Sequence, residues 1–148
     1  MAVSGGVKIV GMRTNKPLLH GAITASIIDC FFDVHKELGF GFREYIYSRA
    51  LQRLLVAKGH KVEREVRVLV YFRGEPLAYE RMDMLVDDTV VIENKAREPL
   101  NSDAQGQLFA ALAATNLEVG LLLHFGRRAR FYRVFFENRF KHRNKQCP

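Results

Sequence analysis

Cysteine is scarce in this chain, and the scarcity excludes two kinds of small domain. The only cysteines among the 148 residues are Cys30, within an apolar stretch, and Cys147, next to the C-terminus. Two cysteines so placed do not make a disulfide framework, and no cysteine and histidine spacing typical of a zinc site is present. We therefore expect a protein of a reducing compartment, cytoplasmic or otherwise intracellular.

Long apolar runs are absent as well. No segment approaches the roughly 18 consecutive apolar residues that indicate a membrane-spanning helix. The N-terminal residues lack the apolar region of a signal peptide, and no internal repeat is present. We expect a single domain that makes no use of a membrane.

Acidic residues are the minority among the charged side chains. Lys and Arg number 23 against 16 Asp and Glu, which gives a formal charge of +7 and a sequence pI near 9.7. Such a balance favours a polyanionic partner or substrate. Hydrophobic residues make up 48% of the chain and aromatic residues 11%, enough for a packed core with disorder confined to the termini.

Apolar periodicity divides the chain into helices and strands. Helical spacing predicts helices over residues 18–38, 43–58 and 104–115. Strand patterns are found over residues 62–72, 119–125 and 131–136, with two more strands on either side of residues 87–89.

This order of elements predicts an α/β or α+β fold in which helices cover a central mixed β-sheet. We expect the folded domain to span residues 17–138. A flexible N-terminal arm over residues 1–16 would precede it, and a basic C-terminal tail over residues 139–148 would follow.

One predicted hairpin carries most of the chemistry. Its turn is Asp87–Thr89, with Asp83 in the strand before it and Glu93 and Lys95 in the strand after it. Side chains alternate along a strand and opposed residues share a face, so a three-residue loop places Asp83 and Glu93 together. Lys95 points the same way as Glu93 because it is two residues further on. Two carboxylates and an ammonium so grouped can hold a divalent metal against a phosphate.

Two simpler interpretations fit the same spacing: an edge hairpin whose charges keep it soluble, or an ion pair between Lys95 and Glu93 or Asp83. The neighbouring residues favour the cluster. Both faces of the hairpin are otherwise apolar, and unpaired carboxylates are costly to bury without a metal ion or a lysine. The residues expected to share the other face are Met82, Met84, Val86, Val90 and Ile92.

A second motif is the segment G-F-R-E-Y-I-Y at residues 41–47. Together with the hairpin residues, Gln107 and the segment 119–126, it resembles the GxxExxY protein family of the PD-(D/E)XK nuclease superfamily. The resemblance extends over about residues 18–136. It implies a restriction-endonuclease-like core with a central mixed β-sheet flanked by helices.

The resemblance also implies an active site that surrounds Mg²⁺ or Mn²⁺. The implied catalytic residues are Glu44, Asp83, Glu93, Lys95 and Gln107, with Asp83, Glu93 and Glu44 as metal ligands. The metal would polarise the scissile phosphate and lower the pKa of a bound water. We expect Lys95 to position the attacking water rather than to take its proton.

The chain departs from the family pattern at three positions. Phe40 stands where a proline is usual, and Asn94 stands where a hydrophobic residue is common between the Glu and the Lys. Ala111 takes the place of an aromatic residue that often follows the glutamine by four positions. The last departure removes a side chain that would stack on or contact DNA.

Each helical candidate has a structural alternative. Glu44 near the start of a helix is favoured by the helix dipole without any metal. Tyr47 would brace Glu44, contact nucleic acid or pack in the core. Gln107 would hold a water or a phosphate oxygen, or would simply be solvated.

Nucleic-acid contacts are expected from the basic turn that carries Arg127, Arg128 and Arg130, with Arg64 and Arg67 as further candidates; a solvated turn is the alternative. The leading functional interpretation is a Mg²⁺- or Mn²⁺-dependent nuclease that hydrolyses phosphodiester bonds, with DNA as the expected substrate. No recognition-helix motif is present, so we expect low sequence specificity.

Two alternatives remain open. One is a catalytically inactive module on the same fold that binds nucleic acid or supports an assembly. The other is a small interaction subunit that pairs with itself. A homo-oligomer also suits the nuclease interpretation, since a small nuclease domain often needs a second copy to embrace a duplex.

Overall fold

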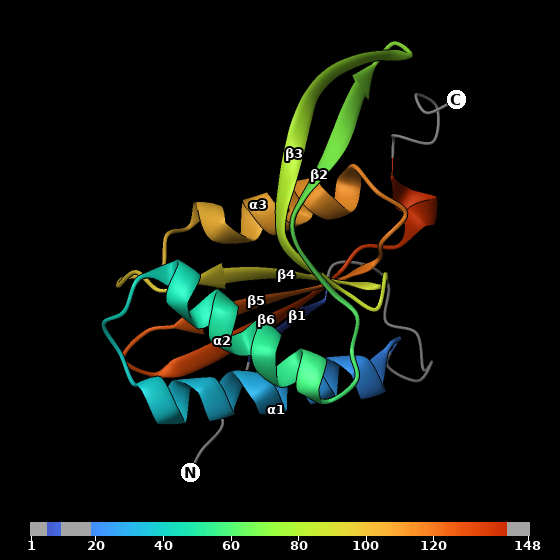
Figure 1. Cartoon of the computed structure of the whole chain (residues 1–148). Helices are drawn as coiled ribbons and strands as arrows, with labels where there is room; N and C mark the ends of the chain where they lie inside the picture. Colours follow the sequence, from blue (N-terminus) through green and yellow to red (C-terminus); the bar gives the residue numbers. More distant parts are fainter. Residues whose placement is uncertain (1–5, 10–18, 142–148) are drawn as a thin grey trace.

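A mixed β-sheet with helices on both of its faces forms the body of the protein. The structure, a computed structural model, describes residues 6–9 and 19–141. Six strands lie in the order β1-β6-β5-β4-β3-β2, with α1 and α2 packed on one face and α3 on the other (Figure 1). The predicted fold class is confirmed.

The elements have the following bounds. The helices are α1 (Gly21–Leu38), α2 (Glu44–Ala57), α3 (Asp103–Ala113) and the short 3₁₀ helix η1 (Asn138–Phe140). The strands are β1 (Gly6–Ile9), β2 (Val62–Phe72), β3 (Glu75–Val86), β4 (Val90–Lys95), β5 (Val119–Phe125) and β6 (Ala129–Phe135). Among the described residues, no helix combines the length and the apolar character needed to cross a membrane.

The directions of the strands determine which strand ends lie next to one another. β4 and β5 are parallel and are joined by α3, as parallel neighbours require a crossover connection. The pairs β2–β3, β3–β4 and β5–β6 are antiparallel, while β1 runs parallel to β6. The C-terminal ends of β4 and β5 therefore lie side by side, with Lys95 opposite His124.

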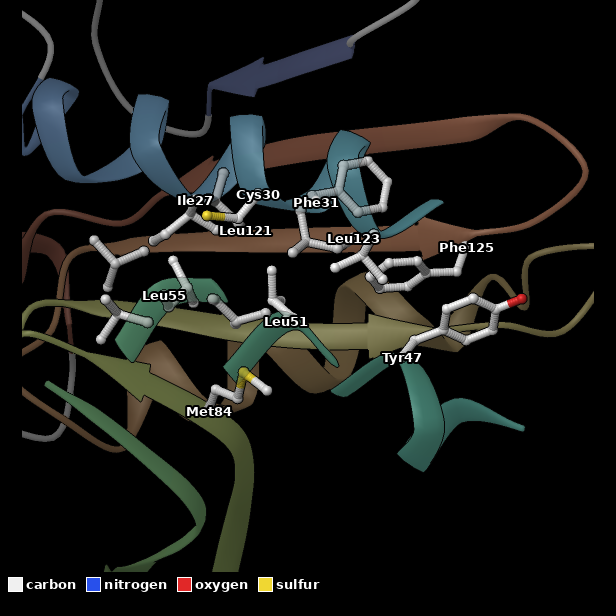
Figure 2. Packing of buried hydrophobic residues seen from close by; sticks show 14 of the residues in the cluster. Ile27, Cys30, Phe31, Tyr47, Leu51, Leu55, Met84, Leu121, Leu123 and Phe125 are labelled. Carbon is white, nitrogen blue, oxygen red and sulfur yellow. The ribbon is translucent and has the colours of Figure 1, made fainter. Parts of the chain in front are cut away.

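The larger core fills the space between the sheet and the helices α1 and α2 (Figure 2). Helical residues one turn apart, such as Leu51 and Leu55, meet Leu121 and Leu123 of β5, and all four are fully buried. All seven residues of β5 are buried because helices cover both faces of this strand.

The smaller core lies under α3, where Leu108 packs against the sheet. A Cβ atom on Gly120 would lie 2.6 Å from the Leu108 Cδ1 atom, so the glycine is required for this close approach. Ala111 is fully buried in the same core. A small residue at this position therefore serves the packing of α3, and the position is not a surface for DNA.

Two features near the ends of the chain differ from the sequence predictions. Gly6–Ile9, inside the expected flexible arm, forms strand β1; the rest of that arm, residues 1–5 and 10–16, lies outside the described residues. Lys141, in the expected tail, is 5% exposed and donates to the carbonyl oxygens of Thr115 and Leu117. Residues 142–148, with Cys147, also lie outside the described residues.

The face assigned to Met82 was wrong. Met84 packs in the core under α1 and α2, whereas Met82 belongs to the core under α3. Glu65, on the neighbouring strand, has a left-handed backbone with φ 56°, and no partner on β3 is recorded for it between the pairs Arg64–Met84 and Val66–Met82. The irregular backbone at Glu65 lies beside the point where the methionines of β3 switch from the core under α1 and α2 to the core under α3.

Beyond this point β2 and β3 continue as a long hairpin that projects past the body of the protein (Figure 1). We call its residues 66–82 the β2–β3 arm. Phe72 and Leu77 near its tip are 53% and 68% exposed, and Tyr79, opposite Leu69, is 62% exposed.

Candidate active site at the β3–β4 hairpin

The hairpin of β3 and β4 has the loop that the spacing predicted. Val86 pairs with Val90 around the three residues Asp87–Thr89, and Met84 pairs with Ile92. One further step of this register sets Asp83 opposite Glu93. The backbone N–H of Asn94 donates to Asp83 Oδ2 at 3.0 Å, which holds the aspartate against β4.

Glu93 is a buried carboxyl group with an unsatisfied oxygen. The residue is 5% exposed, and its Oε2 atom has no hydrogen-bond partner. Burial and then the charge of Asp83 raise the pKa of Glu93 from 4.5 to about 8, although Lys95 acts in the opposite direction. Near neutral pH Glu93 therefore retains its proton in the absence of a cation.

Lys95 connects this pair to helix α3. Its Nζ atom lies 3.5 Å from Glu93 Oε1 and donates to Gln107 Oε1 at 2.8 Å. Gln107 is four residues after the first residue of α3, so the start of this helix places the amide over the end of β4. The structure thus brings Asp83, Glu93, Lys95 and Gln107 into one chain of contacts.

Glu44 approaches the same group from helix α2. It is the first residue of α2 and half-buried, and burial raises its pKa. The positive charge of Lys95 lowers this pKa and the negative charge of Asp83 raises it. These interactions place the Glu44 carboxyl within electrostatic reach of the hairpin, while the helix dipole favours its charged form.

A cleft of about 500 Å³ lies between the start of α2, the end of β4 and the start of α3. Glu44, Lys95 and Gln107 line it. Arg43 and Arg97 also line it, and the sequence reasoning missed both. A usable signal existed, because Arg97 follows Lys95 by two residues and Arg43 directly precedes Glu44.

The two hairpin carboxylates are less exposed than Lys95, which lines this cleft. The side chain of Asp83 is 13% exposed and that of Glu93 is 6% exposed, compared with 22% for Lys95. Among the described residues, no three His, Cys, Asp or Glu side chains are grouped closely enough to form a metal cage. The structure thus offers two close carboxylates, with Glu44 further from them.

The donor set nevertheless suits a hard divalent cation. Mg²⁺ keeps several waters and takes one or two protein carboxylates together with substrate phosphate. Asp83 and Glu93 supply two carboxylates, and the unpartnered Oε2 of Glu93 is an oxygen that a cation would satisfy. Asp83 and Glu93 therefore fit a bound Mg²⁺ or Mn²⁺.

The expectation that Tyr47 contacts nucleic acid was wrong. Its ring is fully buried and stacks on Phe125, with the centroids 4.6 Å apart (Figure 2). Its hydroxyl donates to the Gly39 carbonyl at 2.6 Å and accepts from the Phe42 backbone N–H at 3.2 Å. Tyr47 thus fixes the loop that leads into α2, and through it the position of Glu44.

The basic turn between β5 and β6 lies at the same edge of the sheet as Lys95. Arg127 donates its backbone N–H to Glu98 Oε1 at 2.9 Å, and its guanidinium lies 5.3 Å from the centre of the Phe40 ring. Arg128 and Arg130 are exposed. Their contact with nucleic acid remains a prediction, now with a location beside the cleft.

A second polar cluster, which the sequence reasoning missed, lies at the other end of the hairpin. Ser26 Oγ is 2.7 Å from His60 Nε2, and His60 Nδ1 is 2.6 Å from Asp87 Oδ2. The order Ser, His, Asp matches that of a catalytic triad, which also needs donors for a developing oxyanion. Ser26 lies in the second turn of α1, where backbone N–H groups are engaged in the helix, so we interpret the cluster as a structural link between α1, the connection from α2 to β2 and the hairpin turn.

Comparison with known proteins places most of the chain within a described family. A family model described as the PD-(D/E)XK nuclease superfamily matches residues 21–134. The solved crystal structure of SSO0001 shares 18% sequence identity over 80% of each chain, with a TM-score of 0.45. None of the curated proteins compared with the chain matches it significantly.

Proposed function

Because the chain belongs to the PD-(D/E)XK nuclease superfamily, we propose that it hydrolyses phosphodiester bonds in nucleic acid with a divalent metal held by Asp83 and Glu93. The observation that supports this most strongly is the buried, unpartnered oxygen of Glu93 beside a second carboxylate. Such an arrangement costs stability without a cation, and sites of this kind are typical of function.

The motif at residues 41–47 supports a narrower assignment, to the GxxExxY family within this superfamily. In this chain its glutamate is Glu44, on the wall of the cleft, and its last tyrosine is Tyr47, which braces the loop before α2. The conformation of this loop explains why a motif of this kind would combine a glutamate with a tyrosine one turn later.

The side chains divide the chemistry between them. Asp83 and Glu93 would hold Mg²⁺ or Mn²⁺, which when bound polarises the scissile phosphate and activates water. Lys95 lies between Glu93 and the cleft, so its ammonium would position the attacking water and balance charge on the phosphate. Gln107 accepts a hydrogen bond from Lys95 and so keeps that ammonium directed toward the cleft.

Glu44 would contribute a further carboxyl group from the opposite wall of the cleft. Its raised pKa allows it to hold a proton more readily than an exposed glutamate does, and both Lys95 and Asp83 influence its charge. We place it in the site as a group that orients water or substrate. The substrate we expect is DNA, read through its backbone with low sequence specificity, because no element of the site resembles a base-reading helix.

The test is cleavage of single-stranded and duplex DNA and RNA in the presence of Mg²⁺ or Mn²⁺. Asp83→Ala and Lys95→Ala should abolish cleavage, while Asp88→Ala, an exposed aspartate in the turn of the same hairpin, should leave it intact. All proteins would be purified in parallel so that a contaminating nuclease would be equally present in each. Equal cleavage by wild type and both site variants would sink the proposal.

A catalytically inactive nucleic-acid-binding module is the second candidate, and one observation favours it. The candidate site brings Asp83 and Glu93 close together, and no group of three possible ligands is present among the described residues. This candidate predicts salt-sensitive binding of nucleic acid that survives Asp83→Asn, together with no heat of Mn²⁺ binding in calorimetry. Measurable Mn²⁺ binding that is lost in Asp83→Asn would favour the nuclease.

A further inference from the structure

The β2–β3 arm carries a row of side chains that begins at the candidate active site. Beyond the irregularity at Glu65, residues two apart on β3 share a face, so Arg81 and Tyr79 point the same way. Arg81 joins this face to the candidate site, because its guanidinium lies 3.7 Å from Asp83 Oδ1. The cross-strand register sets Arg67 opposite Arg81 and Leu69 opposite Tyr79. We call Arg67, Arg81 and Tyr79 the outer face of the arm.

The two faces of the arm have different environments. Val66, Val68 and Met82 point the other way and pack into the core under α3. On the outer face, the side chain of Arg81 is 59% exposed, Tyr79 is 62% exposed and Arg67 is also exposed. The arm is therefore anchored by its inner face, and the side chains of its outer face are exposed to solvent.

The charges on the outer face are incompletely balanced. Like charges directly opposite one another destabilise a pair of strands, and Arg67 is opposite Arg81. Arg81 is offset by Glu65 at 2.8 Å and by Asp83 at 3.7 Å. Arg67 has no carboxylate within ion-pair distance among residues 19–141; its guanidinium lies 5.9 Å from the centre of the Tyr79 ring.

We propose that the outer face of the arm binds the backbone of a nucleic-acid duplex on one side of the Asp83–Glu93 site. Arg67 and Arg81 would contact phosphates, and Tyr79 would pack against the sugar or an exposed base and hold the Arg67 guanidinium in place. The inference rests on the proposed function, since the duplex held by the arm is the one that the site would cut.

The spacing of the row sets the length of the contact. A strand advances about 3.4 Å per residue, so Arg81 lies about 7 Å and Tyr79 about 14 Å along β3 from Asp83. These lengths correspond to roughly two and four base pairs of duplex rise. The arm would therefore engage phosphates within about four base pairs of the cut, on one flank only.

A polyanion fits this surface better than a second copy of the chain. The chain carries a formal charge of +7, and the outer face of the arm adds two opposed arginines next to a ring. Two arms placed face to face would bring four arginines together, which like-charge repulsion opposes. Phosphates would relieve that repulsion and would continue toward the carboxylate pair.

Binding of a fluorescent duplex, measured by anisotropy in the Asp83→Asn background without divalent metal, tests the proposal without any need for cleavage. Arg67→Gln should weaken binding several-fold and reduce the slope of log K against log salt by about 0.9, the value for one lost phosphate contact. Arg53→Gln, at an exposed arginine on α2, makes the same charge change and should alter neither quantity. Arg67→Lys should keep the salt slope.

Substrate length sharpens the test. When one flank of the duplex is shortened to fewer than about two base pairs, the reach of Arg67 opposite Arg81, the difference between Arg67→Gln and its parent should disappear. An effect of Arg67→Gln no larger than that of Arg53→Gln would overturn the proposal. So would an Arg67→Gln variant that changes self-association in sedimentation while its affinity for the duplex is unchanged.

The outcomes for the arm and for the nuclease are separable. Binding that depends on Arg67 in a protein that cuts nothing would refute the nuclease and keep the arm. Cleavage that depends on Asp83, together with duplex binding that Arg67→Gln does not change, would support the nuclease and refute the arm.

Discussion

The two ends of the β3–β4 hairpin use the same kind of side chain for opposite purposes. At the turn, Asp87 accepts hydrogen bonds from the Lys61 backbone at 2.9 Å and from His60 at 2.6 Å. Partial burial by itself would raise the pKa of Asp87, but these two hydrogen bonds lower it. At the open end, burial and Asp83 raise the pKa of Glu93 to about 8.

The difference comes from the donors that each end can supply. Near the turn, the backbone N–H of Lys61 and the ring of His60 are available to a carboxylate. Next to Glu93 the main donor is Lys95, which Gln107 shares, so one carboxylate oxygen stays unpartnered. A satisfied carboxylate stabilises the fold, whereas an unsatisfied one lowers stability and is available to a ligand.

The largest expected effect is on activity at the open end. Glu93→Gln should reduce cleavage by more than about 100-fold, since even residues that only support metal ligands cost about 10- to 100-fold when lost. The same substitution should raise the melting temperature near neutral pH, because folding must return to Glu93 a proton that the unfolded chain has released, whereas glutamine needs none. Cleavage rates and thermal unfolding measured side by side would check both the loss of activity and the gain in melting temperature. A Glu93→Gln variant that unfolds more easily and still cleaves would contradict the difference proposed between the two ends of the hairpin.

The next effect is the pH dependence of stability. The folded protein keeps the Glu93 proton up to about pH 8, while the unfolded chain releases it near pH 4.5. Between these values folding takes up a proton, so the free energy of unfolding should fall by a few kcal/mol as the pH rises. Urea unfolding across this range would show the slope, and Glu93→Gln should flatten it. Identical slopes in the two proteins would contradict the raised pKa.

The turn end should behave in the opposite way. Asp87→Asn should destabilise the fold by about 1–3 kcal/mol through weakened charge-assisted hydrogen bonds, without loss of cleavage per folded molecule. The lowered pKa of Asp87 means that its contribution is present at neutral pH and is lost as the pH falls through its folded pKa. Asp88→Asn, at an exposed neighbour, is the matched control for chemical denaturation. Loss of cleavage in folded Asp87→Asn protein would show that the two ends are not separate.

The smallest expected effect concerns the link between Lys95 and α3. Gln107→Ala removes the acceptor at 2.8 Å and leaves the ammonium free to close on Glu93, so kcat should fall about tenfold while KM changes little. The pH profile of kcat should shift as well, because the balance of charge around Glu93 changes. Gln105→Ala on the same helix is the control. A change confined to thermal stability would assign Gln107 a purely structural role.

The local rules of strands and helices account for what the sequence predicted well. Alternation and loop parity predicted a three-residue turn that faces Asp83 toward Glu93, because these rules depend only on residues near one another along the chain. Helical periodicity likewise predicted α1 and α2 to within a few residues. Tyr47 shows the limit, since a position one turn from Glu44 suits a site residue as well as a core residue.

The sequence by itself determined the order of elements from α1 to β6, the mixed sheet and the pairing of two carboxylates on one hairpin. Only the tertiary structure decided how those carboxylates behave, because the pKa of Glu93 depends on burial under other elements and on partners distant in the chain. The same holds for the contact between Gln107 and Lys95, for the burial of Tyr47 against Phe125 and for the pairing of β1 with β6. Periodicity says which way a side chain points along its own element. What lies opposite it is settled when the elements pack together.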